Sequence, residues 1–266
     1  LSQFNNNVSV CTLMGNDKDI KEPLEKFKKK IKTKIFYENK KVTTRKRRFV
    51  ENAYNKKISE VYFMDDNLLG LKNKKKILSY LKKETRKFDA VILIDYGHGF
   101  IDKDIYNVLR QKAKFLAINC QTNSANLGFN LITKYPVSDF ICIDEPELRL
   151  AASNNISEIE EIVKNQITKK IKCKNITITR GRNGSFSYSN SNVFNTPALI
   201  SDKVIDTIGA GDVFLVITSL LYSAKSDQLV TNIIGNIAGA LKVDILGHSK
   251  SISRSNFYAV LNHVLK

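Results

Sequence analysis

The chain has 266 residues, 42% of them hydrophobic, and its 43 Lys and Arg residues against 26 Asp and Glu residues give a net charge of +17. This composition is typical of a folded globular protein and excludes a disordered or fibrous one. No segment approaches the roughly 20 apolar residues that span a bilayer, and no signal-peptide pattern opens the sequence. We therefore expect no membrane partner, and the cysteine pattern described below favours a cytoplasmic protein.

The excess of positive charge raises the question of a nucleic-acid partner. The lysines are scattered along amphipathic helical patterns, as in residues 22–32 and 71–87, where they occupy the solvent face. The sequence has neither zinc-finger spacing nor alternating basic and aromatic residues. A solvated, Lys-rich surface is therefore favoured over one that binds nucleic acid.

Apolar runs rich in β-branched residues alternate with helical patterns, the first of which begins at about Ile20. The predicted strands cover residues 7–15, 89–97, 114–120, 139–144 and 175–181. Continuously apolar strands separated by helices indicate a mainly parallel sheet covered on both faces, and hence an α/β sandwich. The four cysteines lie in separate strand-like runs without metal-ligand spacing, which predicts buried, reduced thiols.

Residues 34–66 interrupt this alternation. They contain short alternating strands and no helical pattern, which predicts a small β lid inserted in an α/β core made of residues 1–33 and 67–266. Such an insert is able to close over a ligand. A second all-β stretch, residues 185–199, precedes the motif that carries the most chemistry.

That motif is "IDTIGAGDVF", residues 205–214. Gly209, Ala210 and Gly211 stand just before an apolar run with helical spacing, so they allow an anion to approach the unpaired amides of a helix N-terminus. Asp212 places a carboxylate beside that anion site, where it can accept a proton from a hydroxyl that attacks a phosphoryl group. The simpler alternative is a tight turn whose acidic residue stabilises the helix.

The longer pattern D-T-x-G-A-G-D-x-F resembles the C-terminal signature of the ribokinase/phosphofructokinase B (PfkB) family of carbohydrate kinases. Four further segments resemble family segments in the same order: residues 91–99, 143–151, 178–184 and 235–253. The resemblance implies a ribokinase-like three-layer α/β/α sandwich, with ATP, Mg²⁺ and in some members K⁺ as cofactors. It further implies phosphorylation of a sugar or sugar phosphate, and is closest to the heptose 7-phosphate kinases.

The resemblance also implies roles for individual residues. Asp212 is the expected base, the backbone of residues 209–211 is the anion hole, and Glu147 organises the magnesium ion. Asp206 and Ser251 fall where the family often holds a monovalent cation. The residues expected near the nucleotide are Asp144, Thr179, Arg180, Gly181, Gly184 and Asn236. No GxxxxGK[ST] stretch is present, which excludes a P-loop at the level of motifs.

The substrate end is expected to combine the lid with a strand end. Alternation along "TTRKRRFVE" puts Arg45 and Arg47 on one face of a strand and Lys46 and Arg48 on the other. Arg45 and Arg47 are the pair expected to clamp a substrate phosphate, although a charged edge strand without a ligand is an equally good interpretation. Asp95 ends a strand where α/β sheets bind ligands, so it is expected to bind sugar hydroxyls.

The chain departs from the family pattern in three places. Asp144 replaces the usual Asn, and residues 117–130 replace a D-P-K-like segment. The family's first strands are missing, so we expect a fragment of a longer protein, which leaves room for a fused nucleotidyltransferase domain. The alternatives are a kinase-fold binding or regulatory module with weakened catalysis, and a nucleoside kinase. Lid strands of the family often pair between subunits, which predicts a homodimer through the lid.

Overall fold

The computed structural model describes most of the chain: residues 1–4, 7–17, 24, 25, 29, 31–39, 41–51, 56–65, 69–199, 204–247 and 249–264. Most of the helix predicted from about Ile20 lies outside these residues. In the described part, no helix is long and apolar enough to cross a membrane.

A six-stranded sheet forms the centre of the molecule, in the order β10-β9-β8-β7-β6-β5. Its strands are β5 (Val91–Asp95), β6 (Leu116–Cys120), β7 (Val137–Asp144), β8 (Lys172–Thr179), β9 (Ser185–Ser189) and β10 (Asn192–Thr196). The first four run parallel, whereas β9 and β10 are antiparallel to their neighbours. The parallel strands alternate with helices in the sequence, which confirms the predicted α/β architecture.

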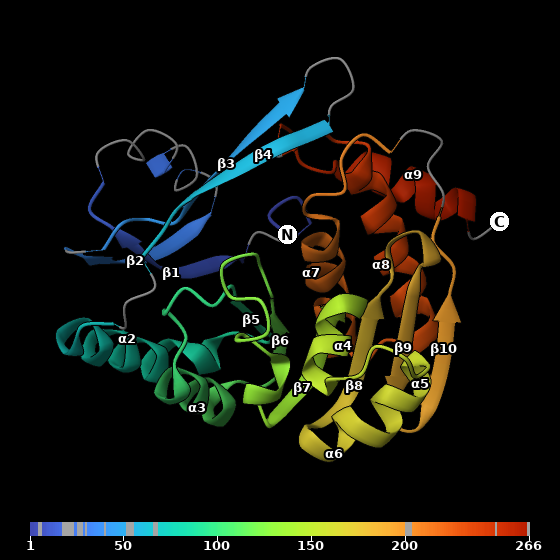
Figure 1. Ribbon diagram of the computed structural model, residues 1–266, viewed down its shortest axis with the longest axis horizontal. Helices are drawn as coiled ribbons and strands as arrows, with labels where there is room; N and C mark the ends of the chain where they lie inside the picture. Colours follow the sequence, from blue (N-terminus) through green and yellow to red (C-terminus); the bar gives the residue numbers. More distant parts are fainter. Residues whose placement is uncertain are drawn as a thin grey trace.

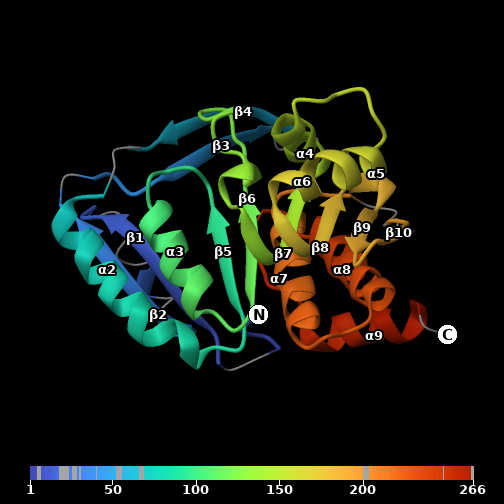
Figure 2. The same cartoon turned by 90° about the horizontal axis from the view of Figure 1, so that it is seen from below.

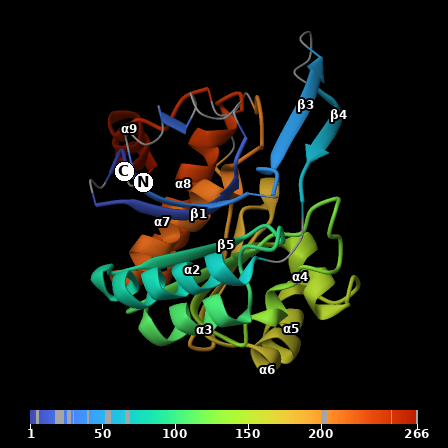
Figure 3. The same cartoon turned by 90° about the vertical axis from the view of Figure 1, so that its left-hand side faces the viewer.

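Helices cover both faces of this sheet. They are α2 (Leu71–Glu84), α3 (Lys103–Lys112), α4 (Glu145–Ala152), α5 (Ile159–Ile162), α6 (Thr168–Lys170), α7 (Ala210–Ser223), α8 (Gln228–Val243) and α9 (Arg254–Val264). A π-helical turn (Val163–Ile167) joins α5 to α6, and 3-10 turns lie at Thr85–Lys87, Ile132–Lys134 and Gly181–Asn183. Figure 3 shows α7, α8 and α9 on one side of the sheet and α2 to α6 on the other.

Strand β7 shows why two helical layers are needed. Its side chains alternate between the faces, so Ile141 and Ile143 belong to the core under α3, α4 and α5, whereas Phe140 and Cys142 pack with the apolar residues of α7. All four side chains are almost completely buried. A strand that is apolar on both faces requires cover on both, and the three-layer sandwich provides it.

Two small sheets accompany the main one. β1 (Ser9–Gly15) pairs in parallel with β2 (Lys32–Glu38), and β3 (Arg45–Glu51) pairs antiparallel with β4 (Lys56–Phe63) in a hairpin. The hairpin projects from the body of the molecule (Figure 1), on the side to which the parallel strands point (Figure 2). Residues 34–38 of the predicted lid therefore pair with β1, and the projecting element begins at β3. The division into core and lid stays a prediction.

Phe140 is fully buried and packs on the Tyr222 ring at 4.6 Å between ring centroids, whereas Phe129 is 92% exposed. We predict that Phe140→Ala lowers the free energy of unfolding by about 3–5 kcal/mol, because it opens a cavity between the sheet and α7. The same substitution at Phe129 should change it by less than about 0.5 kcal/mol. Urea denaturation followed by circular dichroism measures both values, and equal losses would contradict this account of the core.

Candidate active site

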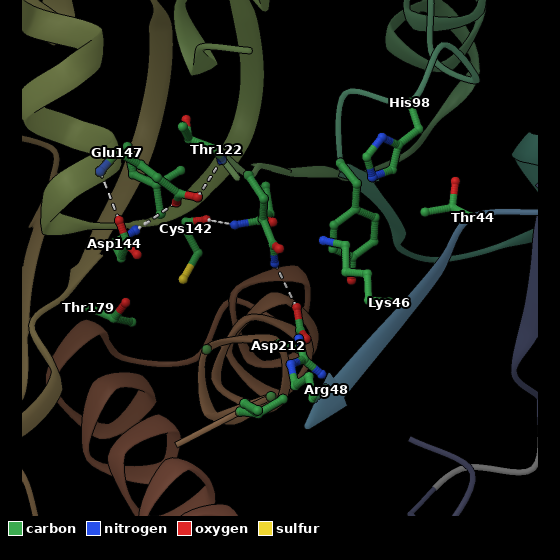
Figure 4. A pocket seen from close by; sticks show the side chains of 17 residues that line it. Thr44, Lys46, Arg48, His98, Thr122, Cys142, Asp144, Glu147, Thr179 and Asp212 are labelled. Carbon is green, nitrogen blue, oxygen red and sulfur yellow. Dashed lines mark hydrogen bonds between the residues drawn. The ribbon is translucent and has the colours of Figure 1, made fainter. Parts of the chain in front are cut away.

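A cavity of about 640 Å³ opens at the carboxyl ends of the parallel strands, below the hairpin (Figure 4). In sheets of this kind ligands bind in the crevice outside those strand ends. Seventeen residues line the cavity: Thr44, Lys46, Arg48, Tyr96, His98, Asn119, Gln121, Thr122, Cys142, Ile143, Asp144, Glu147, Thr179, Ile208, Gly209, Gly211 and Asp212. Six of the residues predicted for the site are among them: Gly209, Gly211, Asp212, Asp144, Glu147 and Thr179.

The start of α7 has free backbone donors at the cavity wall. Gly209 precedes the helix with φ +80°, a left-handed conformation that favours glycine, and no side chain caps the helix. The amides of Gly211 and Asp212 have no acceptor among the described residues. By contrast, Asp102 and Asp227 each accept two amide hydrogen bonds at the starts of α3 and α8. Such unpaired amides at a helix N-terminus attract anions.

Gly211 leaves this position open. A Cβ placed there would meet no atom within 4 Å, so packing does not require glycine at this site. The glycine instead keeps the approach to the neighbouring amides clear. Ala210 is the first residue of α7, between the two glycines, and does not line the cavity.

Asp212 lies in the first turn of α7, half-buried, with its carboxylate at the cavity. Its Oδ1 accepts a hydrogen bond of 2.9 Å from Nε2 of Gln121, the residue that follows β6. The dashed line that ends at Asp212 in Figure 4 marks this contact. The carboxylate is neither buried nor turned away from the space that a substrate would occupy.

Glu147 connects the ends of two strands. Its Oε1 accepts from the amide of Thr122 at 2.9 Å and its Oε2 from the amide of Asp144 at 3.0 Å, while Asp144 Oδ1 accepts from the Glu147 amide at 2.8 Å. The last two bonds form a capping box at the start of α4. Both oxygens of Glu147 are thereby committed to backbone amides that fix the cavity wall.

The environment of Glu147 favours its neutral form. Burial raises the pKa of its carboxyl group to about 7, and the nearby Asp144 carboxylate adds to the shift. The two amide hydrogen bonds act in the opposite direction without cancelling it. A group whose charge changes near pH 7 thus stands at the wall of the cavity.

Two cations of the hairpin complete the site from the other side. Lys46 Nζ lies 5.0 Å from the centre of the Tyr62 ring and 5.8 Å from that of Tyr96, and burial lowers its pKa. Arg48 Nε forms an ion pair of 3.2 Å with Glu60 and also lines the cavity. Side chains of alternate residues on β3 therefore reach toward the start of α7 (Figure 4).

The expected pair, Arg45 and Arg47, lies on the other face of the hairpin. Their guanidinium carbons are 5.3 and 5.7 Å from the centre of the Phe63 ring, and with Phe63 they line a separate hollow of about 380 Å³, which Lys46 also borders. The predicted alternation is present, but the face that meets the cavity carries Lys46 and Arg48. The sequence could not show this, because the alternation of side chains along a strand separates two faces but does not tell which of them meets the cavity.

Asp95 is also placed differently from the expectation. It is 3% exposed and does not line the cavity; its Oδ2 accepts from the Tyr135 hydroxyl at 2.7 Å and pairs with Lys134, and its Oδ1 accepts from the amide of Gly97 at 2.9 Å. These partners satisfy the carboxylate in the protein interior. The residues after the strand that do reach the cavity are Tyr96 and His98.

The expected nucleotide residues divide into two groups. Asp144 and Thr179 line the cavity, at the ends of β7 and β8. Arg180 pairs with Glu145 at 3.5 Å, and Gly184, at φ +77°, lies so close to Thr196 that a Cβ would come within 2.0 Å of its carbonyl oxygen. The cavity is not lined by the other four expected residues, Arg180, Gly181, Gly184 and Asn236.

Asn236, on α8, donates from Nδ2 to Ser185 Oγ at 3.2 Å and to Pro197 O at 3.1 Å. It ties α8 to the start of β9 and the end of β10. Its position beside these strands is compatible with a nucleotide edge, and its role there stays a prediction.

Asp206 and Ser251 were expected at a cation site. The Asp206 carboxylate accepts from the amide of Ile208 at 3.0 Å and from the amide of Gly247 at 2.8 Å, so it joins the loops before α7 and after α8. Ser251 is exposed in the loop before α9. In the described part of the chain no group of three His, Cys, Asp or Glu residues could hold a metal ion by itself.

Sequence patterns offered little sign of three residues at the end of β6 and directly after it. Asn119, Gln121 and Thr122 all reach the cavity, and Asn119 Oδ1 is buried without a hydrogen-bond partner among the described residues. The one feature that could have predicted them is their position at the carboxyl end of a parallel strand, which residues 95–98 share.

The comparisons with known proteins agree with this geometry. The model of the "pfkB family carbohydrate kinase" matches residues 1–240. The chain belongs to the PfkB family of carbohydrate kinases. The match covers the strands, the hairpin and the start of α7, and so all parts of the cavity wall described above.

Curated relatives and solved structures extend this finding. The "Bifunctional protein HldE" of Aliarcobacter butzleri is 24% identical over 251 residues, which are 90% of this chain and 50% of that protein. The protein of the same name in Citrifermentans bemidjiense is 20% identical over 264 residues, 97% of this chain and 53% of that protein. The chain thus spans about half the length of the curated relatives it matches.

Solved structures with the same fold include phosphofructokinase-2 from Escherichia coli in complex with potassium, with a TM-score of 0.79 at 10% identity, covering 100% of this chain and 85% of that one. Ribokinase from Giardia lamblia has a TM-score of 0.73 at 17% identity, with coverage of 95% and 82%. At these identities the likeness shows the ribokinase-like fold alone.

The raised pKa of Glu147 predicts a pH-dependent stability. Because the folded protein holds this proton up to about pH 7 and the unfolded chain loses it near 4.5, the free energy of unfolding should fall as the pH rises through this window, by roughly 3 kcal/mol. In Glu147→Gln this contribution should be absent. Urea denaturation in EDTA at pH 5 to 8 measures the difference from the wild type.

The matched control is Glu161→Gln, on the exposed side of α5. Its stability should follow the pH dependence of the wild type. A Glu147→Gln protein whose stability changes with pH just as the wild type's does would contradict the account of this carboxyl group.

Proposed function

We propose that this PfkB protein transfers the γ-phosphoryl group of ATP to a hydroxyl of a sugar or sugar phosphate of the heptose-phosphate type. The observation that carries the proposal is the juxtaposition of the unpaired amides of α7 with the Asp212 carboxylate at one cavity wall. Donors for a transferring phosphoryl group and a base for the attacking hydroxyl are the two requirements of this reaction.

The reaction follows from the placement of these groups. The amides of Gly211 and Asp212 bind the γ-phosphate oxygens and stabilise the charge that develops on them. The carboxylate of Asp212 takes the proton of the acceptor hydroxyl as it attacks the phosphorus in line. Thr179 and Asp144, at the ends of β7 and β8, border the same cavity and are the residues proposed to contact the nucleotide.

The residues present fit a magnesium ion that arrives with the nucleotide. Mg²⁺ commonly binds one or two carboxylates together with substrate phosphates and water. Asp144 is exposed to the cavity and uses only Oδ1 in the capping box, so its second oxygen is available to the ion or its water. Glu147 has both oxygens committed and acts by holding Asp144 in place. The ion would neutralise phosphate charge.

Lys46 and Arg48 are the groups proposed to recognise a phosphorylated substrate. They are cations at the cavity wall, on the hairpin that faces the α7 amides, and a guanidinium group binds phosphate in a bidentate manner. This assigns to the inward face of the hairpin the role that sequence reasoning gave to Arg45 and Arg47. The match to HldE relatives, at 20–26% identity, supports a heptose-type sugar.

Three wider features are proposed on the same basis. The chain is the kinase part of a longer protein, supported by bifunctional relatives twice its length, in which a nucleotidyltransferase domain would occupy the remainder. A K⁺ ion near Asp206 is a family feature for which the potassium complex of phosphofructokinase-2 is the support. A homodimer formed through the hairpin is proposed from the family resemblance alone.

We predict that Asp212→Asn lowers kcat by at least a hundredfold, because the amide cannot accept the proton, while the affinity for ATP changes little. Coupled-enzyme detection of ADP with ATP, Mg²⁺ and a panel of heptose phosphates, hexoses and nucleosides measures the rate. Asp89→Asn, at an exposed ion pair with Lys114, is the matched control and should retain wild-type turnover. More than a hundredth of the wild-type rate in Asp212→Asn would remove this residue from the role of base.

The hairpin assignment predicts that Arg48→Ala raises KM for a sugar phosphate by about tenfold or more, with KM for ATP nearly unchanged. Arg47→Ala, one residue away on the opposite face, should change neither constant by more than about twofold. Lys46→Ala provides a second test that leaves the Arg48–Glu60 pair intact. If Arg47→Ala raises KM and Arg48→Ala does not, the outer face binds the phosphate.

A further inference from the structure

We propose that Gln121 is a positioning residue for the base: its side-chain amide holds one oxygen of Asp212 and leaves the other to the acceptor hydroxyl. The proposal rests on the function proposed above and deepens it. The residues that carry it come from two distant parts of the sequence, 91 positions apart, which meet at the cavity floor (Figure 4).

The first argument is the way the backbone of Gln121 is held. Its amide donates to the carbonyl of Asp95 at 2.8 Å, and its own carbonyl accepts from Asn130 Nδ2 at 2.9 Å. Asn130, 4% exposed, also donates to the Asp95 carbonyl at 3.1 Å. The main chain of Gln121 is thus fixed between the end of β5 and the loop before Ile132, and only its side chain remains to be placed.

The second argument concerns the carboxylate itself. Gln121 Nε2 donates to Oδ1 of Asp212, and among the described residues it is the only donor to this carboxylate. Oδ2 is therefore the oxygen left for the substrate. A base must present one oxygen at a defined angle to the attacking hydroxyl, and fixing the other oxygen provides that orientation.

The third argument is electrostatic. A hydrogen bond from a neutral amide to a carboxylate favours the ionised form, which is the form that accepts a proton. The Asp212 carboxylate lies half-buried at the cavity wall, beside the place proposed for a negatively charged phosphate. Gln121 gives this carboxylate a hydrogen-bond donor without adding a formal charge that would repel or trap either substrate.

The chemistry of the side chain distinguishes this role from packing. Glutamate has nearly the shape of glutamine but has no N–H donor and adds a negative charge, whereas leucine keeps part of the volume and removes all polarity. Glutamate at this position would place two carboxylates in contact, so that one of them stays protonated to higher pH. Packing alone predicts that Gln121→Glu is harmless, and positioning predicts that it is the worse substitution.

The test uses the full-length protein and records kcat/KM against pH from 5 to 9 with ATP, Mg²⁺ and a heptose 7-phosphate. In Gln121→Leu the acid limb should move to higher pH by about one unit, which is a rate loss of about tenfold at pH values on that limb, and in Gln121→Glu it should move by about two. KM for ATP should stay within about twofold in both variants. Gln111→Leu, at an exposed position of α3, should reproduce the wild-type profile.

A second readout does not need turnover. The side-chain carboxyl carbon of Asp212, assigned by its absence from the NMR spectrum of Asp212→Asn, should titrate at higher pH in Gln121→Glu than in the wild type. Wild-type protein without transfer to any acceptor would overturn the proposed function alone. Active wild type together with acid limbs and carboxyl titrations that coincide in all variants would overturn the role of Gln121.

Discussion

The unpaired amides at the start of α7 are the constraint on which the rest of the site depends. The starts of α3, α4 and α8 are closed by the side chains of Asp102, Asp144 and Asp227, because an amide without an acceptor is costly once it leaves water. At α7 the chain uses Gly209 instead, which turns the backbone without supplying an acceptor. The missing acceptor must come from a ligand or from solvent, and the surrounding cavity admits both.

Three carboxyl groups close to an anion site would repel a nucleotide if all were free and charged. Each of the three carboxyl groups has a different environment. Glu147 is buried against backbone amides with its pKa raised to about 7, Asp144 caps α4 with one oxygen, and Asp212 is held by a neutral amide. Cations from the hairpin, Lys46 and Arg48, face them across the cavity. The balance allows a phosphate to enter a region that is rich in acidic residues.

The sequence predicted the fold well because two strong signals agreed. Apolar runs such as that of β7 (Val137–Asp144) are buried on both faces, as expected for a covered parallel sheet, and the glycine-rich motif coincides with the uncapped start of α7. The placement of Asp144, Glu147 and Asp212 followed from the family resemblance. The inward face of β3 and the burial of Asp95 could not follow, because each depends on contacts between segments far apart in the chain.

The burial of Asp95 changes what the acceptor end of the cavity can recognise. The carboxylate of Asp95 accepts a hydrogen bond from Tyr135 and pairs with Lys134, so it does not orient sugar hydroxyls. The main-chain carbonyl of the same residue accepts the hydrogen bond from the Gln121 amide. In the proposed reaction, recognition of the acceptor would fall to residues that do line the cavity: Tyr96 and His98, one and three residues further along, and the inward face of the hairpin. Between these two residues the backbone requires glycine: Gly97 has φ +74°, and a Cβ there would come within 2.1 Å of the Asn126 side chain. The loop after β5 is therefore packed closely on the loop after β6, whose Asn123 and Asn126 also donate to the Tyr96 carbonyl, whereas the hairpin projects from the body of the molecule (Figure 1).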